Sequence, residues 1–380
     1  MYEVQGTCDE RFSAVRAVFA ANFANGLDAG ASVAVTLAGQ PVVDLWAGYA
    51  DDATQRPWER DTIANVYSTT KTMTALCALI LADRGELDFY APVARYWPEF
   101  AANGKSEVQV RHLMSHSSGL SGWSEPMTVE DLYDWEKATS LLAAQAPWWE
   151  PGTASGYHAI TQGYLVGEVV RRITGKSLGT FFRNEVAVPL DADFHIGLAA
   201  KDDARVADLI PPESVSEQFA ADRTSMTGRT LLNPPMDALD SRTEGWRRAE
   251  IPAANGHGNA RSVARIHTAL ANGGAAFGKR LLSQAGCDRV FDEQQKGIDL
   301  VLGTPLRLGM GFGLTSPEMP LGPNPRTCFW GGWGGSIALI DFDAHLSISY
   351  VMTKMNSTTV GDARSAGLVG AVYQSLAVPA

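Results

Sequence analysis

Segments typical of β-strands lie at the two ends of this sequence, and helical segments lie between them. Near the start, 31–37 and 41–48 are two such runs, separated by a short Gly-containing link that is typical of a hairpin. The strand-like runs in the last hundred residues are 308–314, 328–330, 336–341 and 346–353. We therefore expect one sheet built from both ends of the chain, with a helical insertion between them.

Amphipathic periodicity predicts the main helices. They cover 9–25, 68–84, 130–145, 159–174, 259–272 and 359–376, whereas the polar stretch 201–245 has no clear pattern. The predicted fold class is α/β (α+β), with a mostly antiparallel sheet flanked by helices. We assign 1–60 and 250–380 to the sheet domain and 61–249 to a mainly helical domain, and we expect the active site in the cleft between the two.

The charge balance excludes several kinds of partner. The 380 residues include 31 Lys and Arg against 42 Asp and Glu, and a net charge of −11 repels phosphate backbones and anionic membranes. No apolar run reaches the roughly 18 residues that cross a bilayer, and the N-terminus has no basic stretch followed by an apolar one. The four cysteines are scattered, which suits neither zinc nor a redox pair. We expect a cytoplasmic protein that acts on a small molecule and binds neither nucleic acid nor membranes; its oligomeric state stays open.

The strongest chemical signal is Ser68-Thr-Thr-Lys71, the only Ser-x-x-Lys in the chain. It begins a predicted helix, so the two side chains lie one turn apart on the same face. The first turn of a helix also has unpaired N–H groups beside the serine. A serine hydroxyl needs a neighbouring base to act as a nucleophile, and a buried lysine with a lowered pKa can be that base. The alternative is a helix-capping serine with a solvated lysine.

A glycine-bounded loop, 151–159, delivers Tyr157 just ahead of another helix. A phenol beside a lysine ammonium is pushed toward phenolate, which makes Tyr157 a second candidate base. The alternative is a tyrosine that only packs in the core.

A third feature is the Gly-rich segment 329–336, Phe-Trp-Gly-Gly-Trp-Gly-Gly-Ser, at the end of a strand-like run. Glycines beside a strand let a substrate approach the backbone, whose N–H groups can form an oxyanion hole. The alternative is a bulge or a sheet corner.

Together these features resemble the serine β-lactamase and penicillin-binding-protein superfamily. The order is Ser68-x-x-Lys71, Tyr157 about ninety residues later, and a Gly-rich strand in the last quarter. The segments 112–120, 151–158, 173–179 and 193–197 are similar to the family VIII carboxylesterases, which share the class C β-lactamase fold. The resemblance covers nearly the whole chain.

The resemblance implies roles for these residues. Ser68 would form an acyl-enzyme, Lys71 and Tyr157 would share the proton transfers, and the N–H groups of Ser68 and Trp333 would hold the oxyanion. It implies neither a metal nor an organic cofactor.

Two departures from the β-lactamase pattern bear on the substrate. Ala159 stands where β-lactamases of this fold have an asparagine that binds the acylamide chain, and Trp330-Gly331-Gly332 replaces Lys-Thr-Gly, which removes a cation for a substrate carboxylate. An indole favours neutral, apolar groups, so we expect a carboxylesterase for small, neutral, short-acyl esters. The expected pocket residues are Trp330, Gly331, Gly332, Trp333, Trp123, Trp149 and His158.

Other motifs suggest other sites. Residues 175–179 match Gly-x-Ser-x-Gly, but a helical pattern precedes Ser177, which therefore reads as the cap of the next helix. Residues 273–280 resemble a phosphate-binding loop without its final Ser or Thr, and follow a helix, so we expect a surface turn. His112 and His116 are four apart, but no third metal ligand is evident.

Several functions stay open from sequence. The same acyl-enzyme could pass its acyl group to an alcohol or amine, which would make the protein an acyltransferase. A β-lactamase or D-Ala-D-Ala peptidase is a third alternative. A non-catalytic binding protein with the same fold is a fourth, against which the presence of all three catalytic side chains argues.

Overall fold

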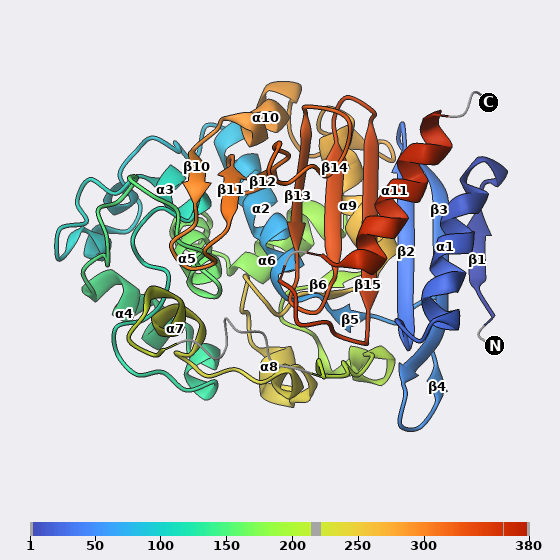
Figure 1. Cartoon of the computed structure of the whole chain (residues 1–380). Coiled ribbons are helices and arrows are strands. Elements are labelled where there is room, and N and C mark those ends of the chain that lie inside the picture. Colours follow the sequence, from blue (N-terminus) through green and yellow to red (C-terminus); the bar gives the residue numbers. More distant parts are fainter. Residues whose placement is uncertain (1–2, 214–221, 360, 378–380) are drawn as a thin grey trace.

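The computed structural model describes residues 3–213, 222–359 and 361–377, and its centre is an antiparallel sheet (Figure 1). In spatial order the strands are β1 (Gln5–Cys8), β3 (Gln40–Asp51), β2 (Gly30–Leu37), β15 (Leu346–Met352), β14 (Ile337–Asp341), β13 (Thr327–Gly331), β12 (Gly313–Leu314), β11 (Pro305–Leu308) and β10 (Gln295–Ile298). A short strand, β4 (Arg56–Pro57), also pairs with β3.

The two ends of the chain meet in the middle of this sheet. β2 pairs with β15 over seven residue pairs, from Leu37 opposite Leu346 to Ala31 opposite Met352. The prediction of one mostly antiparallel sheet built from both termini is confirmed. Its strands come from 5–57 and from 295–352, whereas the domain boundaries at 60 and 250 stay a prediction.

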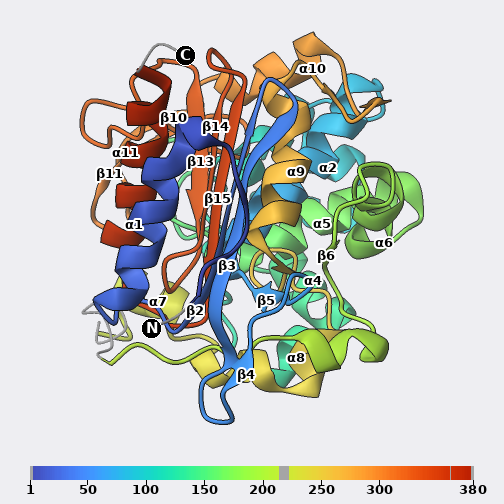
Figure 2. The same ribbon diagram turned by 90° about the vertical axis from the view of Figure 1, so that its right-hand side faces the viewer.

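Helices cover both faces of the sheet (Figure 2). α1 (Ser13–Ala24) packs against α11 (Ala363–Ala377) on one face, and α9 (Ala260–Ala271) packs on β2, β14 and β15 on the other. Because both faces are covered, β2 is buried along nearly its whole length and consists mostly of small and β-branched residues. The core therefore extends through the sheet into the helical layers.

The helical part of the molecule surrounds α2 (Lys71–Asp83), whose side chains are buried from Lys71 to Ala82. α2 contacts α5 (Thr161–Thr174), α6 (Leu178–Phe182) and α10 (Gln284–Asp288). The remaining helices are α3 (Val110–Met114), α4 (Trp135–Ala144), α7 (Met226–Leu231) and α8 (Glu244–Arg248). The first residue of α2, Lys71, is therefore buried deep in the protein.

Two small sheets complete the fold. One consists of β5 (Ala64–Asn65), β7 (His257–Gly258) and β6 (Phe194–His195). Of these strands, β5 lies just before the turn that leads into α2. β8 (Ala275–Ala276) and β9 (Lys279–Arg280) form a hairpin after α9.

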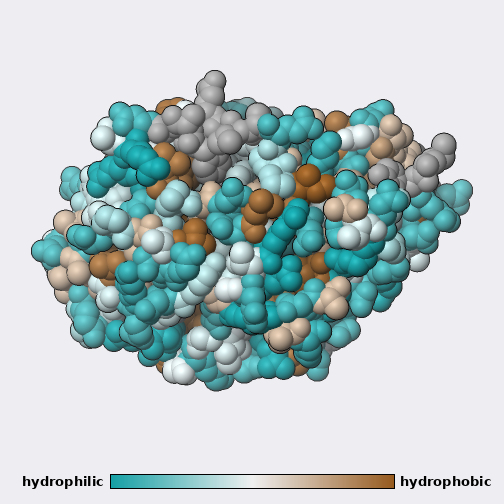
Figure 3. Space-filling view, turned by 90° about the horizontal axis from the view of Figure 1, so that it is seen from below, coloured by the Kyte–Doolittle hydropathy of each residue, from teal (hydrophilic) through white to brown (hydrophobic). Residues whose placement is uncertain are grey.

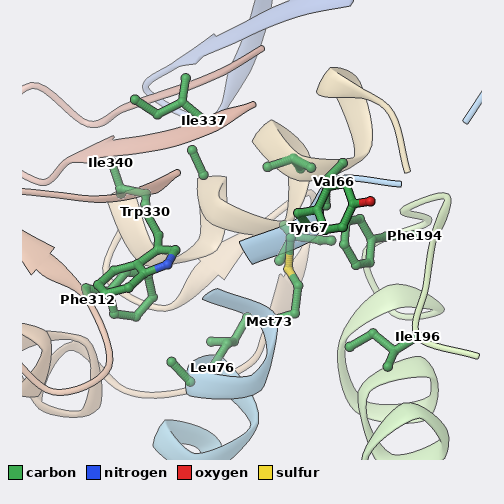
Figure 4. Packing of buried hydrophobic residues seen from close by; sticks show 14 of the residues in the cluster. Val66, Tyr67, Met73, Leu76, Phe194, Ile196, Phe312, Trp330, Ile337 and Ile340 are labelled. Carbon is green, nitrogen blue, oxygen red and sulfur yellow. The ribbon is translucent and has the colours of Figure 1, made fainter. Parts of the chain in front are cut away.

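A compact apolar cluster joins the sheet to the start of α2 (Figure 4). Val66 and Tyr67 lie just before α2, Met73 lies in its first turns, and Trp330 of β13 packs beside Phe312. All of these side chains are buried. The cluster holds the end of β13 close to the beginning of α2.

Most predicted helices and strands are present, and one strand prediction is wrong. The run 308–314 is broken after Leu308 by a turn with Gly311 at a φ of 85°, and β12 begins only at Gly313. The predicted helix 68–84 starts with a 3₁₀ turn, Tyr67–Thr70, ahead of α2. Part of the unassigned stretch 201–245, residues 214–221, lies outside the described residues.

Within the described part of the chain, no helix combines the length and the apolar character that a bilayer span requires. On the face seen from below, apolar residues form small separate groups in a mostly hydrophilic surface (Figure 3).

Candidate active site

Ser68 lies in the tight turn that leads into α2. The preceding residue, Tyr67, has a φ of 43°, a left-handed conformation that is costly for a residue with a bulky side chain. Its hydroxyl donates to the carbonyl oxygen of Ala238 at 3.1 Å, and its ring lies 5.1 Å from that of Trp333. These contacts hold the strained turn, and strain of this kind is typical of functional sites.

The end of β13 packs directly against this turn. A Cβ atom on Gly332 would lie 2.1 Å from the carbonyl oxygen of Val66, so only glycine fits there. Ser336 Oγ donates to the same carbonyl at 2.9 Å and lies 2.9 Å from Thr69 Oγ1. The Gly-rich segment and the serine turn are therefore joined on both sides of Ser68.

Ser68, Lys71 and Tyr157 form one hydrogen-bonded group. Tyr157 Oη lies 2.5 Å from Ser68 Oγ, and Lys71 Nζ lies 3.1 Å from each of these oxygens. Ser68 is 9% exposed and Lys71 is 1% exposed. The three residues that the sequence indicated in two distant motifs are therefore in direct contact.

The surroundings of Lys71 favour its uncharged form. Burial lowers the pKa of Lys71 well below its usual value. Nζ also donates to two backbone carbonyls, those of Ala159 at 2.7 Å and Ala253 at 3.0 Å. Nζ therefore lies within hydrogen-bonding distance of four oxygen atoms, and an uncharged amine, with two N–H donors and one lone pair, can donate to both carbonyls and accept from one hydroxyl.

The expectation that Tyr157 tends toward phenolate is wrong for the free protein. Burial raises the pKa of Tyr157 to about 12, and the negative charge of Asp299 acts in the same direction. At neutral pH the phenol is therefore protonated and can pass a proton between its neighbours.

An apolar cavity of about 20 Å³ opens beside the group. Residues that line it include Tyr157, Leu302, Leu306, Leu308, Phe329 and Trp330. The Trp330 indole stacks on His116 with ring centres 5.2 Å apart, which holds it as a fixed wall. Such walls suit a small uncharged group beside Tyr157.

Comparison with known proteins places this geometry in a family. The model of the family described as Beta-lactamase matches residues 19–371. The chain belongs to the beta-lactamase family. Members with this fold are serine hydrolases, and a curated relative, the esterase/beta-lactamase LipL of Mycobacterium tuberculosis, is 39% identical, covering 94% of this chain and 84% of its own length.

Solved structures of the family agree closely with the fold. A family VIII carboxylesterase is 44% identical with a TM-score of 0.92, covering 98% of this chain and 100% of its own. A penicillin-binding protein homologue from Caulobacter crescentus is 39% identical with a TM-score of 0.90, over the same shares of the two chains. The resemblance seen in the sequence is therefore confirmed, and so is the β-lactamase-like fold.

Two of the predicted pocket residues lie in the interior of this family member instead. His158 has no exposed surface, and its ring nitrogens lie 2.7 Å from Ser118 Oγ and 2.6 Å from the Gly156 carbonyl oxygen. Trp123 is buried and donates from Nε1 to the carbonyl oxygen of Ala138 at 2.9 Å. Their polar atoms are hydrogen-bonded within the protein, so these two side chains belong to the interior and not to the surface of the pocket.

The other predicted residues lie nearer the opening. Gly331 lines the cavity, and Gly332 closes against Val66. Trp333 is half-buried over Tyr67. Trp149 is also half-buried and donates from Nε1 to the carbonyl oxygen of Ala154 at 3.0 Å, within the loop that carries Tyr157.

The alternative motifs have structural roles. Ser177 caps α6 by accepting from the N–H of Thr180 at 3.3 Å, and it follows a helix that ends at Gly175 with a φ of 68°. This confirms the helix cap and excludes a strand-to-serine elbow. Residues 275–280 form the β8–β9 hairpin, as the surface-turn reading expects. Among the residues that the structure describes, no group of three or more His, Cys, Asp or Glu could hold a metal.

The sequence analysis did not predict the groups that hold Lys71 and Tyr157 in place. The carbonyls of Ala159 and Ala253 give no signal in sequence, because every residue has one. His116 was considered only as a metal ligand, and Asp299 was not considered. A buried Asp between apolar neighbours, as in Ile298-Asp299-Leu300, is the one pattern that could have pointed to it.

Proposed function

We propose that this protein is a carboxylesterase that works through an acyl-enzyme on Ser68. The observation that carries the proposal is the placing of Lys71 Nζ and Tyr157 Oη 3.1 Å and 2.5 Å from Ser68 Oγ in a buried site. An amine with a lowered pKa and a phenol that can relay protons, both within hydrogen-bonding distance of one hydroxyl, form the arrangement that a serine nucleophile needs.

In the proposed reaction, Ser68 gives its proton to the Lys71–Tyr157 pair as Oγ attacks the ester carbonyl carbon. The tetrahedral intermediate collapses, the bond to the alcohol oxygen breaks, and the pair returns the proton to the leaving alcohol. A water molecule then gives a proton to the same pair and attacks the acyl-enzyme. The acid leaves as Oγ recovers its proton, so the cycle closes without any other reactant.

We assign the oxyanion hole to the backbone N–H groups of Ser68 and Trp333. Ser68 lies in the first turn of a helix, where backbone N–H groups have no intrahelical acceptor. Trp333 directly follows Gly332, whose close approach to Val66 brings this segment alongside the serine. N–H donors in these places would face the developing negative charge.

The substrate we propose is a small neutral ester with a short, apolar acyl group. The cavity beside Tyr157 is apolar and small, and Trp330 stands where a β-lactamase has a cation. Ala159 offers only a methyl group where a β-lactam side-chain amide would seek a partner. The names of the 39% identical relative and the 44% identical structure, both esterases, support the same substrate class.

β-Lactam hydrolysis is a second candidate. It is favoured by the double name of the Mycobacterium tuberculosis relative and by the 39% identical penicillin-binding protein homologue. Transfer of the acyl group to an alcohol or amine would use the same intermediate.

The test measures hydrolysis of aryl esters from acetate to decanoate beside a chromogenic cephalosporin, with and without an added alcohol acceptor. We expect the short esters to be turned over fastest. Ser68→Ala should lower kcat/KM for them by at least about 10⁴-fold, while Ser177→Ala should match the wild type. Faster turnover of the cephalosporin than of every ester, or activity that survives Ser68→Ala, would refute the proposal, and an ester product with the added alcohol would indicate acyl transfer.

A further inference from the structure

Three consecutive backbone N–H groups in the Tyr157 loop are all held by two residues from distant parts of the chain. The N–H of Gly156 donates to the carbonyl oxygen of His116 at 2.9 Å. That of Tyr157 donates to Asp299 Oδ1 at 3.0 Å, and that of His158 donates to His116 Nδ1 at 3.1 Å. The backbone around the phenol is thus bound at every residue, outside any helix or strand.

Asp299 connects this loop to a second one. Its Oδ1 also accepts from the N–H groups of Val301 and Leu302, both at 2.9 Å. A backbone bond runs the other way, from the N–H of Leu300 to the carbonyl oxygen of Ser155 at 2.8 Å. Leu302 lines the apolar cavity together with Tyr157. One carboxylate oxygen therefore joins the catalytic tyrosine to a wall of the pocket.

The burial of Asp299 is not explained by stability. The residue is 1% exposed, it has no ion-pair partner among the residues of 3–213, 222–359 and 361–377, and its Oδ2 is buried without a hydrogen bond. A buried carboxylate without a cation costs free energy of folding, and a neutral acceptor would serve the same backbone donors at lower cost. A buried carboxylate without a cation, hydrogen-bonded to the backbone of Tyr157, therefore points to a role in the site.

His116 also holds Tyr157 in place. His116 itself has a φ of 58°, and its ring packs 5.3 Å from the Tyr157 ring and 5.2 Å from that of Trp330. The phenol is therefore held from both sides of its backbone and over one face of its ring. Asp299, in addition, accepts a hydrogen bond from Leu302, which lines the cavity.

We propose that Asp299 is a positioning residue. Its hydrogen bond from the Tyr157 N–H keeps the phenol within hydrogen-bonding distance of Ser68, and its hydrogen bond from the Leu302 N–H fixes the cavity wall relative to that phenol. The inference rests on the proposed function, because it needs Tyr157 to act in proton transfer. The charged or titratable groups that face Tyr157 are Lys71, His116, His158 and Asp299. Asp299 touches neither Ser68 nor the cavity and acts only through Tyr157 and Leu302.

The test compares Asp299→Ala and Asp299→Asn with a matched buried carboxylate. Asp341 is also buried, and its Oδ1 accepts from the N–H groups of Asp343 and Ala344 at 3.0 and 2.9 Å, at the far end of β14. Its Oδ2 also accepts from Asn324 Nδ2 and Tyr373 Oη, both at 2.8 Å, so Asp341→Ala removes a buried backbone anchor away from the site together with two side-chain hydrogen bonds. The readouts are kcat and KM for a short aryl ester, and the Tm of each variant.

We expect Asp299→Ala to lower kcat by about 100-fold, because a displacement of the phenol near 1 Å costs about that much. KM should change by less than about threefold, since Asp299 itself does not line the cavity and Leu302 is also held by its own packing. Asp299→Asn keeps an acceptor oxygen and should recover most of the lost kcat. Asp341→Ala should lower the Tm while keeping kcat within about twofold of the wild type.

A kcat of Asp299→Ala within threefold of the wild type would overturn the inference. So would an equal loss of kcat in Asp341→Ala, or an Asp299→Asn variant no better than Asp299→Ala. Ser68→Ala, measured alongside, separates this inference from the proposed function. If Ser68→Ala is inactive and Asp299→Ala is not, only the positioning role fails, whereas an active Ser68→Ala variant removes the catalytic proposal itself.

Discussion

Arg364 donates a hydrogen bond of 2.8 Å from Nη2 to the carbonyl oxygen of Gly334, one residue after Trp333. The guanidinium is 5% exposed and also pairs with two buried carboxylates, Asp28 at 2.9 Å and Asp362 at 2.6 Å. The segment that we assign to the oxyanion hole is therefore anchored to α11, on the opposite face of the sheet from α9. A buried charge network supports the Gly-rich end of β13.

Replacing this arginine should be costly. Arg364→Ala leaves Asp28 and Asp362 buried without a cation, so we expect a loss of about 3–5 kcal/mol in the free energy of unfolding. Arg326→Ala is the control, because its pair with Asp288 is about half exposed and should be worth less than about 1 kcal/mol. Urea denaturation of both variants measures the difference. Equal losses in the two would mean that the buried network contributes nothing special.

Lys71 should lower stability in a way that depends on pH. Its pKa in the folded protein is well below the usual 10.5, so folding must release a proton that the unfolded chain keeps. This cost grows by about 1.36 kcal/mol for each pH unit below 10.5, until the folded pKa is reached. Lys71→Met should therefore be inactive, and its stability relative to the wild type should increase as the pH is lowered from 10 to 7. Urea unfolding at several pH values measures this, and a difference that does not vary with pH would contradict a neutral Lys71.

The catalytic rate should also decrease as the pH is lowered. The rate should fall as pH decreases through the folded pKa of the Lys71–Tyr157 pair, because protonated Lys71 no longer accepts the Ser68 proton. No alkaline loss from Tyr157 ionisation is expected below about pH 11, since the pKa of Tyr157 is raised to about 12. A pH profile of kcat/KM measures both limits as properties of the pair. An alkaline limb near pH 8 that disappears in Tyr157→Phe would contradict this assignment.

The hydroxyl of Tyr157 should matter for rate and little for stability. Tyr157→Phe keeps the ring contacts with His116 and Trp330 but removes Oη from its place 2.5 Å from Ser68 Oγ. We expect kcat to fall by about 10²–10⁴-fold, with an unfolding free energy within about 1 kcal/mol of the wild type. The matched control is Tyr164→Phe. The Tyr164 hydroxyl is also buried and donates a hydrogen bond of 2.5 Å to the Leu132 carbonyl oxygen, but it makes no hydrogen bond to Ser68. Comparable rate losses in both variants would indicate a general structural effect.

The cavity wall should set acyl length. Leu306→Ala enlarges the cavity beside Tyr157, so longer acyl chains should gain about fourfold in relative kcat/KM for each added methylene that becomes buried. Leu314→Ala removes another buried leucine, from the neighbouring strand β12 and outside the cavity lining. It should destabilise the protein by about 2–5 kcal/mol and leave the chain-length preference unchanged. The same shift in both variants would separate this cavity from substrate binding.

Local patterns were enough to predict the sheet and the helices that surround it. The alternation and β-branched content of 31–37 and 346–353 predicted two strands, although their pairing in the middle of the sheet joins residues over 300 positions apart. The strand prediction at 308–314 failed because the backbone turns at Gly311, which apolar content alone does not reveal. Short elements such as β1 and β10 have too few residues to show a period.

The sequence by itself determined which atoms could do chemistry: a serine and a lysine one helical turn apart, a tyrosine in a glycine-bounded loop, and a Gly-rich strand end. Only the tertiary structure decided how those atoms are charged and held. Burial lowers the pKa of Lys71 and raises the pKa of Tyr157, and the carbonyls of Ala159 and Ala253, with Asp299, accept hydrogen bonds from these two residues. The physical reason is that desolvation and backbone hydrogen bonding arise from contacts between distant segments, and no local pattern of residue types records them.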